Sequence, residues 1–406
     1  MLRIPTYNLT RLGARSFSTS RTSLVAPFLY SPLNDQRSLL SIQGKDTTKL
    51  LQGLVSNDVK KVQQSTECSE AKEGQVPLIY MGLLQADGRY MSDLFLHSHP
   101  SPSDPSQPSY MIDHPSLQSS QIRTYLKRHI LRSKLKLGKE VESEWEVVQA
   151  WRNTDPSVTK EDVKKGEEWF EEQGKGRDPR VLGMGWRWIA KKAEELPSDL
   201  FQRTTQSHYH LHRITHSIPE NPPDFPALPL EANLDLMNGI DYKKGCYVGQ
   251  ELTARTHFKG VVRKRGVALR LFREGEDEPT ELLAAPSHTL IPSPSLYPTP
   301  QPGSILTPLP PSSSTPSRRA PRPAGKLGLS LPLISPSGST STIAFASVKI
   351  DALDQTFVVS PPSKKEGDGV GELQEGEMEE GRWFAKAWMN EWVEFRLEEE
   401  EIAKGV

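Results

Sequence analysis

Cysteine is scarce in this chain of 406 residues, which contains only Cys68 and Cys246. Two cysteines exclude a disulfide framework, and they exclude any metal or cluster site that takes four cysteine ligands from one chain. Long hydrophobic runs are missing too, because polar or charged residues interrupt every apolar window before the ~18–20 residues that a membrane-spanning helix needs. The sequence therefore predicts a protein of a reducing compartment, without a membrane span.

An excess of charge of one sign is also lacking, since 50 lysines and arginines face 51 aspartates and glutamates. The whole chain therefore has no electrostatic preference for nucleic acid or for an acidic membrane, and any such preference must be local. Hydrophobic residues make up 35% of the sequence, which is low for a wholly compact protein. The length suits two or three domains of ~100–200 residues each, and the composition predicts that they carry polar insertions.

Acidic residues are absent from the N-terminal segment, where Asp35 is the first carboxylate. Residues 1–24 instead contain four arginines and many serines and threonines, a composition typical of mitochondrial transit peptides. A disordered basic tail is the alternative, but the lack of acids together with the richness in hydroxyl groups favours a transit peptide. We therefore expect a mitochondrial matrix protein.

Hydrophobic periodicity predicts strands and helices that are mixed along the chain. Strands are expected at 37–43, 78–85 and 89–97, and the dipeptide Asp87-Gly88 suits a tight turn between the last two. Helices are expected from 116 onward and around 209–214. The predicted organisation is a transit peptide at 1–24, the first part of an α+β body at 25–150, a charged connection at 151–180, the remainder of that body at 181–258, a β domain at 259–350, an acidic loop at 351–381 and an amphipathic helix at 382–406.

Proline is concentrated in one stretch of the predicted β domain. Residues 286–323 contain twelve prolines among many serines and threonines. Because proline has no backbone N–H to donate, we expect this stretch to be a disordered insertion without strands. Near the C-terminus, aromatic residues recur at helical spacing between Phe384 and Phe395, which favours a helix docked on the body over a partner-binding helix.

The densest motif runs from 241 to 251 and encloses Cys246 between two glycines, shortly after Lys243 and Lys244. Nearby cations favour the thiolate over the thiol, and the thiolate is the form that attacks electrophiles or binds metals. Cys246 is therefore a candidate nucleophile and a candidate metal ligand, while a buried inert thiol is the alternative. Cys68 lies in a polar stretch without such neighbours, and we expect no role for it.

Residues 244–251 read Lys-Gly-Cys-Tyr-Val-Gly-Gln-Glu and are followed by Ala254-Arg255. This run resembles the K-G-C-[FYW]-x-G-Q-E signature of the YgfZ/GcvT-like family. Three other stretches are similar to that family in the expected order: 51–58, the segment from Asp87 to Asp93, and 228–235. The resemblance covers about residues 35–350, apart from the insertions.

Together with the transit peptide, the resemblance points to the iron–sulfur cluster assembly factors of this family, which are required for the maturation of 4Fe–4S proteins. It implies a fold of the α+β class, a three-domain cloverleaf that binds tetrahydrofolate and ends in a C-terminal β barrel. The implied partners are A-type iron–sulfur carriers. One cysteine cannot hold a cluster, so Cys246 would share an iron–sulfur cluster with a carrier that supplies the other ligands.

The resemblance also assigns roles to single residues. Glu231 matches the glutamate that binds the pterin ring in the aminomethyltransferase relatives, although a structural role remains the alternative. Asp93 falls near the catalytic carboxylate of those enzymes, but Ser92 stands where they carry a second carboxylate. Lys244 and Arg255 belong to a stretch with nine basic residues and one acid, 243–273, where an anionic folate tail would be attracted. A solvated strand face is the alternative for that basic stretch.

Two functions of different classes follow from the residues and the resemblance. The first is an assembly factor in which Cys246 is a cluster ligand or nucleophile. The second is a one-carbon (aminomethyl) transferase that uses tetrahydrofolate, so the sequence leaves open whether the protein is an enzyme. A scaffold without a ligand would leave the cysteine motif unexplained. Nucleic acid is not expected as a partner, because no platform of aromatic and basic residues accompanies the basic stretch.

Overall fold

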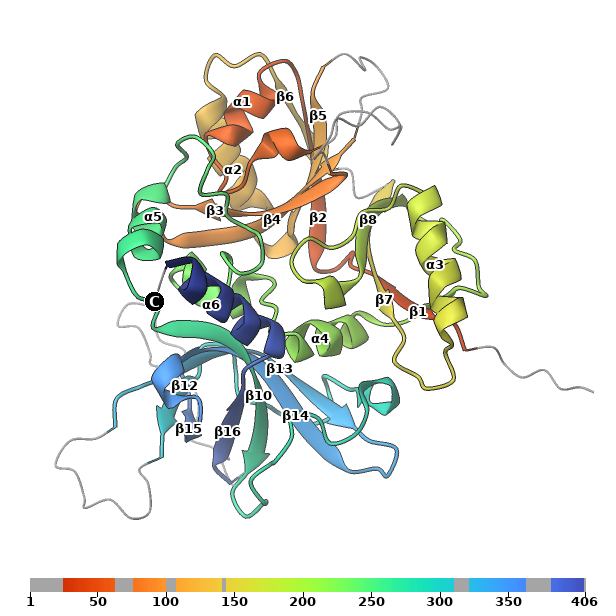
Figure 1. Cartoon of the computed structure of the whole chain (residues 1–406), viewed down its shortest axis with the longest axis vertical. Helices are drawn as coiled ribbons and strands as arrows, with labels where there is room; N and C mark the ends of the chain where they lie inside the picture. Colours follow the sequence, from red (N-terminus) through yellow and green to blue (C-terminus); the bar gives the residue numbers. More distant parts are fainter. Residues whose placement is uncertain are drawn as a thin grey trace, which may run out of the picture.

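The computed structural model describes residues 25–62, 76–99, 107–140, 144–309, 321–362 and 381–404. They form three lobes, each built on its own β-sheet, around the helices α4 (Gln206–Thr215) and α6 (Glu391–Lys404) (Figure 1). The predicted transit peptide, Cys68 and parts of the stretches 286–323 and 351–381 lie outside the described residues. Within the described ranges, no helix is long and apolar enough to cross a bilayer.

The first lobe is a five-stranded antiparallel sheet in the order β3-β4-β5-β2-β6. Strand β3 is buried on both faces, because alternate side chains enter two cores: Tyr80 packs between the lobes, and Met81 packs under the helices. Gly88, with a φ of +83°, confirms the predicted tight turn between β3 and β4. The elements are β2 (Arg37–Gln43), α1 (Thr47–Gln52), η1 (Val59–Lys61), β3 (Leu78–Leu84), β4 (Tyr90–Ser98), β5 (Ser109–Pro115), η3 (Ser116–Gln118), α2 (Ser119–Ile130) and β6 (Lys136–Glu140).

The second lobe is a four-stranded sheet in the order β8-β7-β1-β9. Strand β1 precedes the first lobe in sequence and pairs with β7, which follows it, so the segment predicted as one body at 25–150 is divided between two sheets. The elements are β1 (Phe28–Pro32), β7 (Trp145–Arg152), α3 (Lys160–Glu172), η4 (Leu182–Met184), β8 (Trp186–Lys191) and β9 (Phe201–Arg203).

The predicted charged connection at 151–180 is wrong, because its middle is helix α3, which packs on the second sheet. Phe170 is fully buried and stacks on Trp186 with a centroid distance of 4.2 Å. Gly166 lets the ring of Phe28 approach, since a Cβ atom there would lie 2.6 Å from Phe28 Cδ2. The other side chains of α3 are mostly charged and exposed, and they mask its narrow apolar side in the sequence pattern.

The third lobe is a six-stranded barrel in the order β13-β12-β15-β16-β10-β14, closed by pairing of β14 with β13. A short seventh strand, β11, pairs with the far end of β13. The α+β class and the C-terminal barrel implied by the family resemblance are therefore confirmed. The elements are β10 (Lys264–Arg273), β11 (Ile291–Pro292), β12 (Ile305–Pro308), β13 (Gly325–Ile334), β14 (Thr340–Lys349), β15 (Thr356–Ser360) and β16 (Trp383–Trp388).

Three segments that were expected to lie outside the barrel sheet supply strands to it. The stretch 286–323 contributes β11 and β12, whose prolines Pro292 and Pro308 stand at strand ends, where a missing N–H donor costs little. The predicted loop at 351–381 contributes β15. The predicted helix at 382–406 begins as strand β16, because a spacing of four residues, as between Phe384 and Trp388, puts side chains on one side of a strand as well as of a helix.

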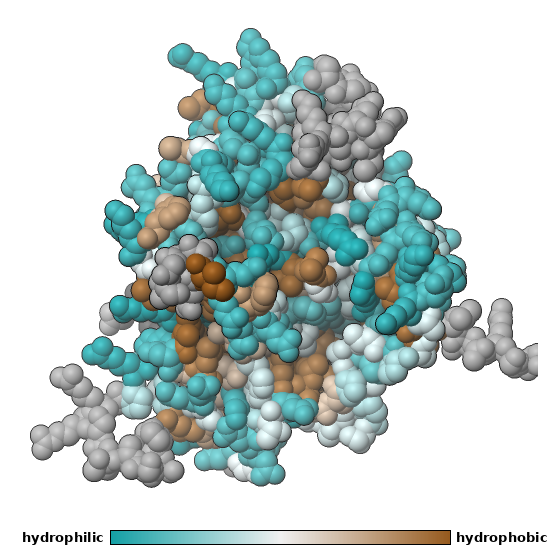
Figure 2. All heavy atoms as spheres, in the orientation of Figure 1, coloured by the Kyte–Doolittle hydropathy of each residue, from teal (hydrophilic) through white to brown (hydrophobic). Residues whose placement is uncertain are grey.

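Helices and short turns fill the space between the lobes. Helix α6 docks there through Trp392, whose indole Nε1 donates to the carbonyl of His216 at 2.8 Å. Figure 2 shows hydrophobic residues in the middle of this face, where the lobes meet, and a mostly hydrophilic periphery. The remaining elements are η5 (Pro222–Asp224), η6 (Pro229–Ala232), α5 (Gln250–Lys259), η7 (Ser287–Thr289) and η8 (Ile350–Ala352).

Candidate functional site

The signature loop is anchored to the first lobe by Lys244. Its ammonium Nζ donates to three backbone carbonyls at the C-terminal end of helix α1 and just after it, those of Gln52, Val55 and Asn57, at 2.8, 2.6 and 2.9 Å. Burial lowers the pKa of Lys244 to about 8. Since an ammonium group has three donors, none is left for a folate carboxylate. The geometry therefore corrects the expectation that Lys244 binds a cofactor: it joins two of the family-like stretches, 51–58 and 244–251.

A second anchor follows on the other side of the cysteine. The backbone N–H of Val248 donates to the carbonyl of Gly53 at 3.0 Å. Gly249 then begins helix α5 with a φ of +80°, and it packs against the end of β3. A Cβ atom at Gly249 would lie 2.8 Å from Leu84 Cβ and would also collide with the carbonyl oxygen of Gln85. The loop is thus held on both sides of Cys246.

We predict that Gly249→Ala destabilises the protein by about 1–3 kcal/mol, because it combines a positive φ with a collision against backbone atoms. Gly245→Ala, four residues earlier in the same loop, is the matched control, since a Cβ atom there meets nothing within 4 Å. Urea unfolding of both variants measures the difference. Equal stability of the two variants would contradict the anchoring of the loop at Gly249.

Cys246 itself is an exposed free thiol on this anchored loop. The alternative of a buried inert thiol is therefore wrong. The neighbouring Gly245 is exposed as well, so the approach to the sulfur is open. The chemistry available at such a position is ligation of a metal or attack on an electrophile presented by another molecule.

Glu231 lines a cavity of about 190 Å³ between η6, helix α5 and the segment before β10. The charged neighbour of its carboxylate in the described part of the chain is the Lys264 ammonium, at 3.7 Å. Across the cavity, the hydroxyl of Thr253 is buried and has no hydrogen-bond partner among the described residues. The cavity therefore offers an acceptor and an unused hydroxyl, with Arg263 also in its lining.

The residues that follow Glu231 in the stretch 228–235 attach this stretch to strand β10. Asn233 adopts a φ of +59°, and its side chain exchanges two hydrogen bonds with the backbone of Gly266. Arg265 donates to both carboxylate oxygens of Asp235 at 2.8 and 3.0 Å. These contacts fasten η6 to the first strand of the barrel, and they fix where Glu231 lies.

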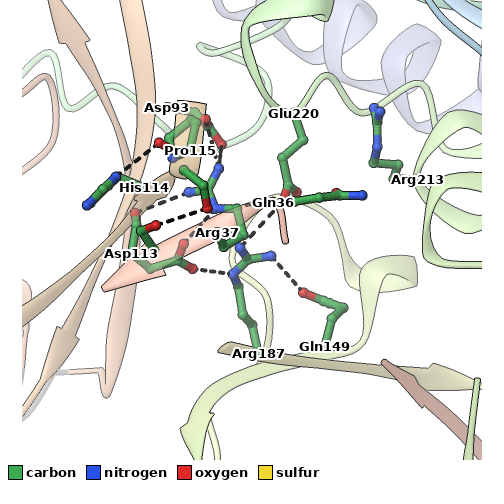
Figure 3. Close-up of polar contacts among 12 residues, drawn as sticks. Gln36, Arg37, Asp93, Asp113, His114, Pro115, Gln149, Arg187, Arg213 and Glu220 are labelled. Carbon is green, nitrogen blue, oxygen red and sulfur yellow. Dashed lines mark hydrogen bonds and ion pairs between the residues drawn. The ribbon is translucent and has the colours of Figure 1, made fainter. Parts of the chain in front are cut away.

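Asp93 belongs to a different place, a buried charge network between the first two lobes (Figure 3). Both of its carboxylate oxygens accept from Arg37 Nη1 at 3.0 Å, and neither side chain is exposed. Arg37 Nε also donates to Asp113 at 2.6 Å. Burial raises the pKa of Asp93 against the pull of the Arg37 guanidinium. A carboxylate enclosed in this way does not face a substrate, so Asp93 does not join Glu231 at a cofactor site.

The network extends through two further arginines. Arg187 donates to Asp113 at 2.7 Å and lies 3.5 Å from Glu220, while Arg180 donates to Glu220 at 2.7 Å and also pairs with Asp178. Burial opposes ionisation of Asp113, but the guanidiniums of Arg187 and Arg37 outweigh it and hold its pKa well below the usual range. The network therefore joins three arginines to four carboxylates inside the protein.

The structure brings together only part of the predicted site. Cys246 and Lys244 share one loop, Glu231 faces a cavity lined by α5, and Asp93 lies in the charge network. Arg255 is on α5 and exposed, outside the lining of that cavity. Sequence reasoning missed Arg37, Asp113, Arg180, Arg187 and Glu220, because charged residues within otherwise ordinary strands and loops carry no local sign of burial.

Comparison with known proteins adds independent information. The chain is 37% identical over 283 residues to the iron-sulfur cluster assembly factor IBA57 homolog, mitochondrial, of Mycosarcoma maydis, an alignment that covers 68% of this chain and 64% of that protein. It is 33% identical over 246 residues to the protein of the same description from Neurospora crassa, covering 59% and 53%. The chain thus spans less than two thirds of the length of either relative. No protein-family model matches it.

Among solved structures, the fold is similar to the glycine cleavage system aminomethyltransferase T from Bartonella henselae. The TM-score is 0.52 with 10% sequence identity, and the match covers 91% of this chain and 88% of that one. At this identity the likeness concerns the fold alone. The signature motif, the sequence relatives and the fold agree, and they confirm the predicted resemblance of this chain to the YgfZ/GcvT-like family.

Proposed function

We propose that the protein is a mitochondrial iron–sulfur cluster assembly factor for the maturation of 4Fe–4S proteins, acting in the matrix with A-type carriers. The observation that carries this proposal is the exposed thiol of Cys246 on a loop held at Lys244 and at Gly249. Such a loop presents one sulfur in a fixed position to an incoming partner. The names of the relatives, which describe mitochondrial assembly factors, support the same function and the same location.

The cluster is cargo that the protein shares and does not hold alone. Iron–sulfur clusters bind to several cysteines, and Cys246 is the free cysteine of the described residues. Within those residues, no group of three or more His, Cys, Asp or Glu side chains is placed to hold a metal ion. The partner must therefore supply the other ligands, as a carrier with its own cysteines would.

Charge around the cysteine favours an acidic partner surface. The exposed charged side chains of the loop and α5 are three cations, Lys243, Arg255 and Lys259, and one acid, Glu251, so positive charge is in excess. Exposed charges of one sign speed the encounter with a surface of the opposite sign and set its orientation.

The test of the proposed assembly function is anaerobic reconstitution of the protein with an apo A-type carrier, iron and sulfide. Visible absorption reports cluster formation with Cys246 present or replaced.

Tetrahydrofolate fits the Glu231 cavity in part. The volume of about 190 Å³ is below the ~300–1,000 Å³ of typical sites for drug-sized ligands, so it suits a ring system and leaves a long tail outside. The Glu231 carboxylate can accept two neighbouring N–H groups of a pterin, and the unused Thr253 hydroxyl can bond to its rim. Arg263 also lines the cavity and supplies a cation for an anionic tail. When bound, tetrahydrofolate supplies a carrier for one-carbon units.

We predict that the protein binds tetrahydrofolate and that Glu231→Gln weakens this affinity about tenfold, because an amide cannot accept two N–H groups side by side. Calorimetric titration measures the affinity. Glu251→Gln, an exposed acid on α5 outside the cavity lining, is the control and is expected to bind like the unaltered protein. Absence of heat with the unaltered protein, or equal affinity of the two variants, would remove the support for folate.

Aminomethyl transfer is the weaker function for this geometry. The carboxylate that the resemblance placed at a catalytic position, Asp93, is fully buried and accepts from Arg37 with both oxygens. A general base must reach the proton that it removes. The network keeps Asp93 away from any reacting group, which supports assembly over transfer.

A further inference from the structure

Positive charge gathers on the first lobe, in a part of the chain far from the signature loop. Residues 114–139 contain seven lysines and arginines and no aspartate or glutamate, although the whole chain has 50 basic and 51 acidic residues. The stretch comprises η3, helix α2, the turn that follows it and most of strand β6. Such an imbalance within a balanced chain gives the first lobe a local field that the total charge conceals.

The exposed cations of this stretch lie beside those of helix α1. The backbone N–H of Lys134 donates to the carboxylate of Asp46 at 2.6 Å, which ties the turn after α2 to the start of α1. Figure 1 shows α1 and β6 at the end of the first lobe that points away from the other two lobes. We call the exposed cations at this end the basic patch: Lys45, Lys49, Lys127, Arg128, Arg132, Lys134 and Lys136.

The charges of the basic patch are available to a partner. None of its seven side chains forms an ion pair with a carboxylate of the residues that the structure describes. Leu135 and Leu137 pack against the core of the first lobe, so the exposed lysines that alternate with them face outward. Segments 45–49 and 127–136 hold one acid, Asp46, against the seven cations. The surface therefore attracts an anionic partner.

An exposed leucine stands within the basic patch. Leu131 is 88% exposed and lies between Arg128 and Arg132 in sequence. The backbone N–H of Ser133 donates to the carbonyl of Ile130 at 2.7 Å and closes a tight turn around it. In this turn Leu131 has a φ of +42° and a ψ of −106°. These values are close to those of a type II′ turn, whose first central position favours glycine.

This conformation gives Leu131 no benefit inside the protein. A branched apolar side chain at positive φ strains the backbone, and its exposure gives up the gain of burial. Contact with an apolar phase outside the protein would restore that gain. Cations around a projecting apolar side chain suit the surface of an anionic membrane, where the charges meet lipid phosphates and the apolar group enters the boundary of the acyl chains.

We propose that the basic patch binds the protein to an anionic membrane surface, with its cations on lipid phosphates and Leu131 inserted among the headgroups. Nucleic acid is the weaker partner, because the exposed side chains of the patch include no aromatic ring to stack on bases, and a leucine adds nothing to contacts with phosphate. Neither Cys246 nor Glu231 belongs to this surface. The proposal therefore goes beyond the assembly function, and its test does not depend on cluster formation.

The experiment is co-sedimentation of residues 25–406 with vesicles of phosphatidylcholine, with or without about 20 mol% of the anionic lipid cardiolipin. Every described element lies in this range, and the arginines of residues 1–24 would themselves bind to anionic lipid. Sedimentation is expected only with cardiolipin and is expected to decrease as salt is added, because salt screens exposed charges. No binding to the cardiolipin vesicles, or equal binding to both kinds of vesicle, would overturn the proposal.

The contribution of charge is tested by Arg128→Gln/Arg132→Gln. This variant is expected to bind cardiolipin vesicles about twentyfold more weakly, since one cation near an anionic surface contributes about fivefold. Lys160→Gln/Lys165→Gln removes two exposed lysines of α3 and is the matched control, expected to bind like the unaltered protein. Equal affinities of the two double variants would overturn the assignment of the surface to this patch.

The contribution of insertion is tested by Leu131→Asn, which is expected to weaken vesicle binding about fivefold. Asparagine tolerates positive φ, so this variant retains the turn, and circular dichroism verifies the fold. Leu117→Asn, at an 81% exposed leucine before α2, is the matched control and should leave binding unchanged. Equal binding of these two variants would overturn the proposal. Binding of a DNA duplex as tightly as the vesicles would assign the patch to nucleic acid and overturn it as well.

Discussion

Cys246→Ala is expected to abolish the visible absorption of a cluster reconstituted anaerobically from this protein and an apo A-type carrier. The loop places this sulfur in the open, and the other described residues offer no substitute set of ligands. Cys246→Ser is expected to reduce the absorption strongly, since a hydroxyl is a far poorer ligand than a thiolate for iron in a cluster. In matrix extracts, both variants should lower the activity of 4Fe–4S enzymes such as aconitase.

The chain provides a matched control for this experiment. Cys68→Ala removes the second cysteine, for which the sequence predicts no role, and it should leave both the absorption and the aconitase activity unchanged. The loop carries its backbone anchors independently of the sulfur, so Cys246→Ala should unfold at the same urea concentration as the unaltered protein. Full absorption with Cys246→Ala would contradict the proposed function, whereas a loss with Cys68→Ala would show that the wrong cysteine had been identified.

Arg37→Met is expected to lower the free energy of unfolding by about 3–5 kcal/mol, the largest effect on stability that we predict. Arg37 is fully buried and pairs with two carboxylates, Asp93 and Asp113. Removing one partner of a buried ion pair leaves the other charge without compensation in a medium of low polarity. Methionine fills much of the volume of the arginine stem, so the loss is chiefly electrostatic. Urea unfolding at neutral pH measures the change.

A second substitution separates charge from packing. Arg37→Met/Asp93→Asn removes the carboxylate that the single variant leaves unpaired, since Asp113 still pairs with Arg187, and it is expected to recover part of the lost stability. Arg128→Met, an exposed arginine on α2, is the control and should change stability by no more than about 0.5 kcal/mol. A single variant at Arg37 within 1 kcal/mol of the unaltered protein would contradict the structural importance of the network.

The parts of the fold that were predictable have local causes. The dipeptide Asp87-Gly88 predicted the turn between β3 and β4, because Asp-Gly between two apolar runs favours a tight hairpin turn. In the structure Gly88 has the positive φ that such a turn requires. The run 244–251 marked the loop of Cys246 through its order of residues alone. Where a helix and a strand would give the same local pattern of side chains, the sequence did not distinguish between them. Phe384 and Trp388 fit a helix and a strand equally well, and only pairing with β10 and β15 made their segment a strand.

The candidate site was predictable in its residues but not in its arrangement. Lys244 was expected near a ligand because it is a cation beside a cysteine, yet its ammonium donates to carbonyls at the end of α1 and just after it, which lie 187 to 192 positions away in sequence. Glu231 was predicted as a site residue from its place in a family-like stretch. Thr253, which lines the same cavity, was not predicted, because no sequence motif marks its hydroxyl as a binding group. His208 and His212 of α4 line a cavity only because the second lobe and η7 pack against that helix.

By itself, the sequence determined the scarcity of cysteine, the order of the family-like stretches and the residues that surround Cys246, because each depends on neighbours along the chain. The tertiary structure decided that Asp93 is locked in a charge network and that Cys246 is exposed. Arg37 and Asp93 are 56 positions apart, and Arg187 and Asp113 are 74 apart. Whether such charges are solvated or buried in pairs depends on how the lobes pack, and no local pattern of residues carries that information.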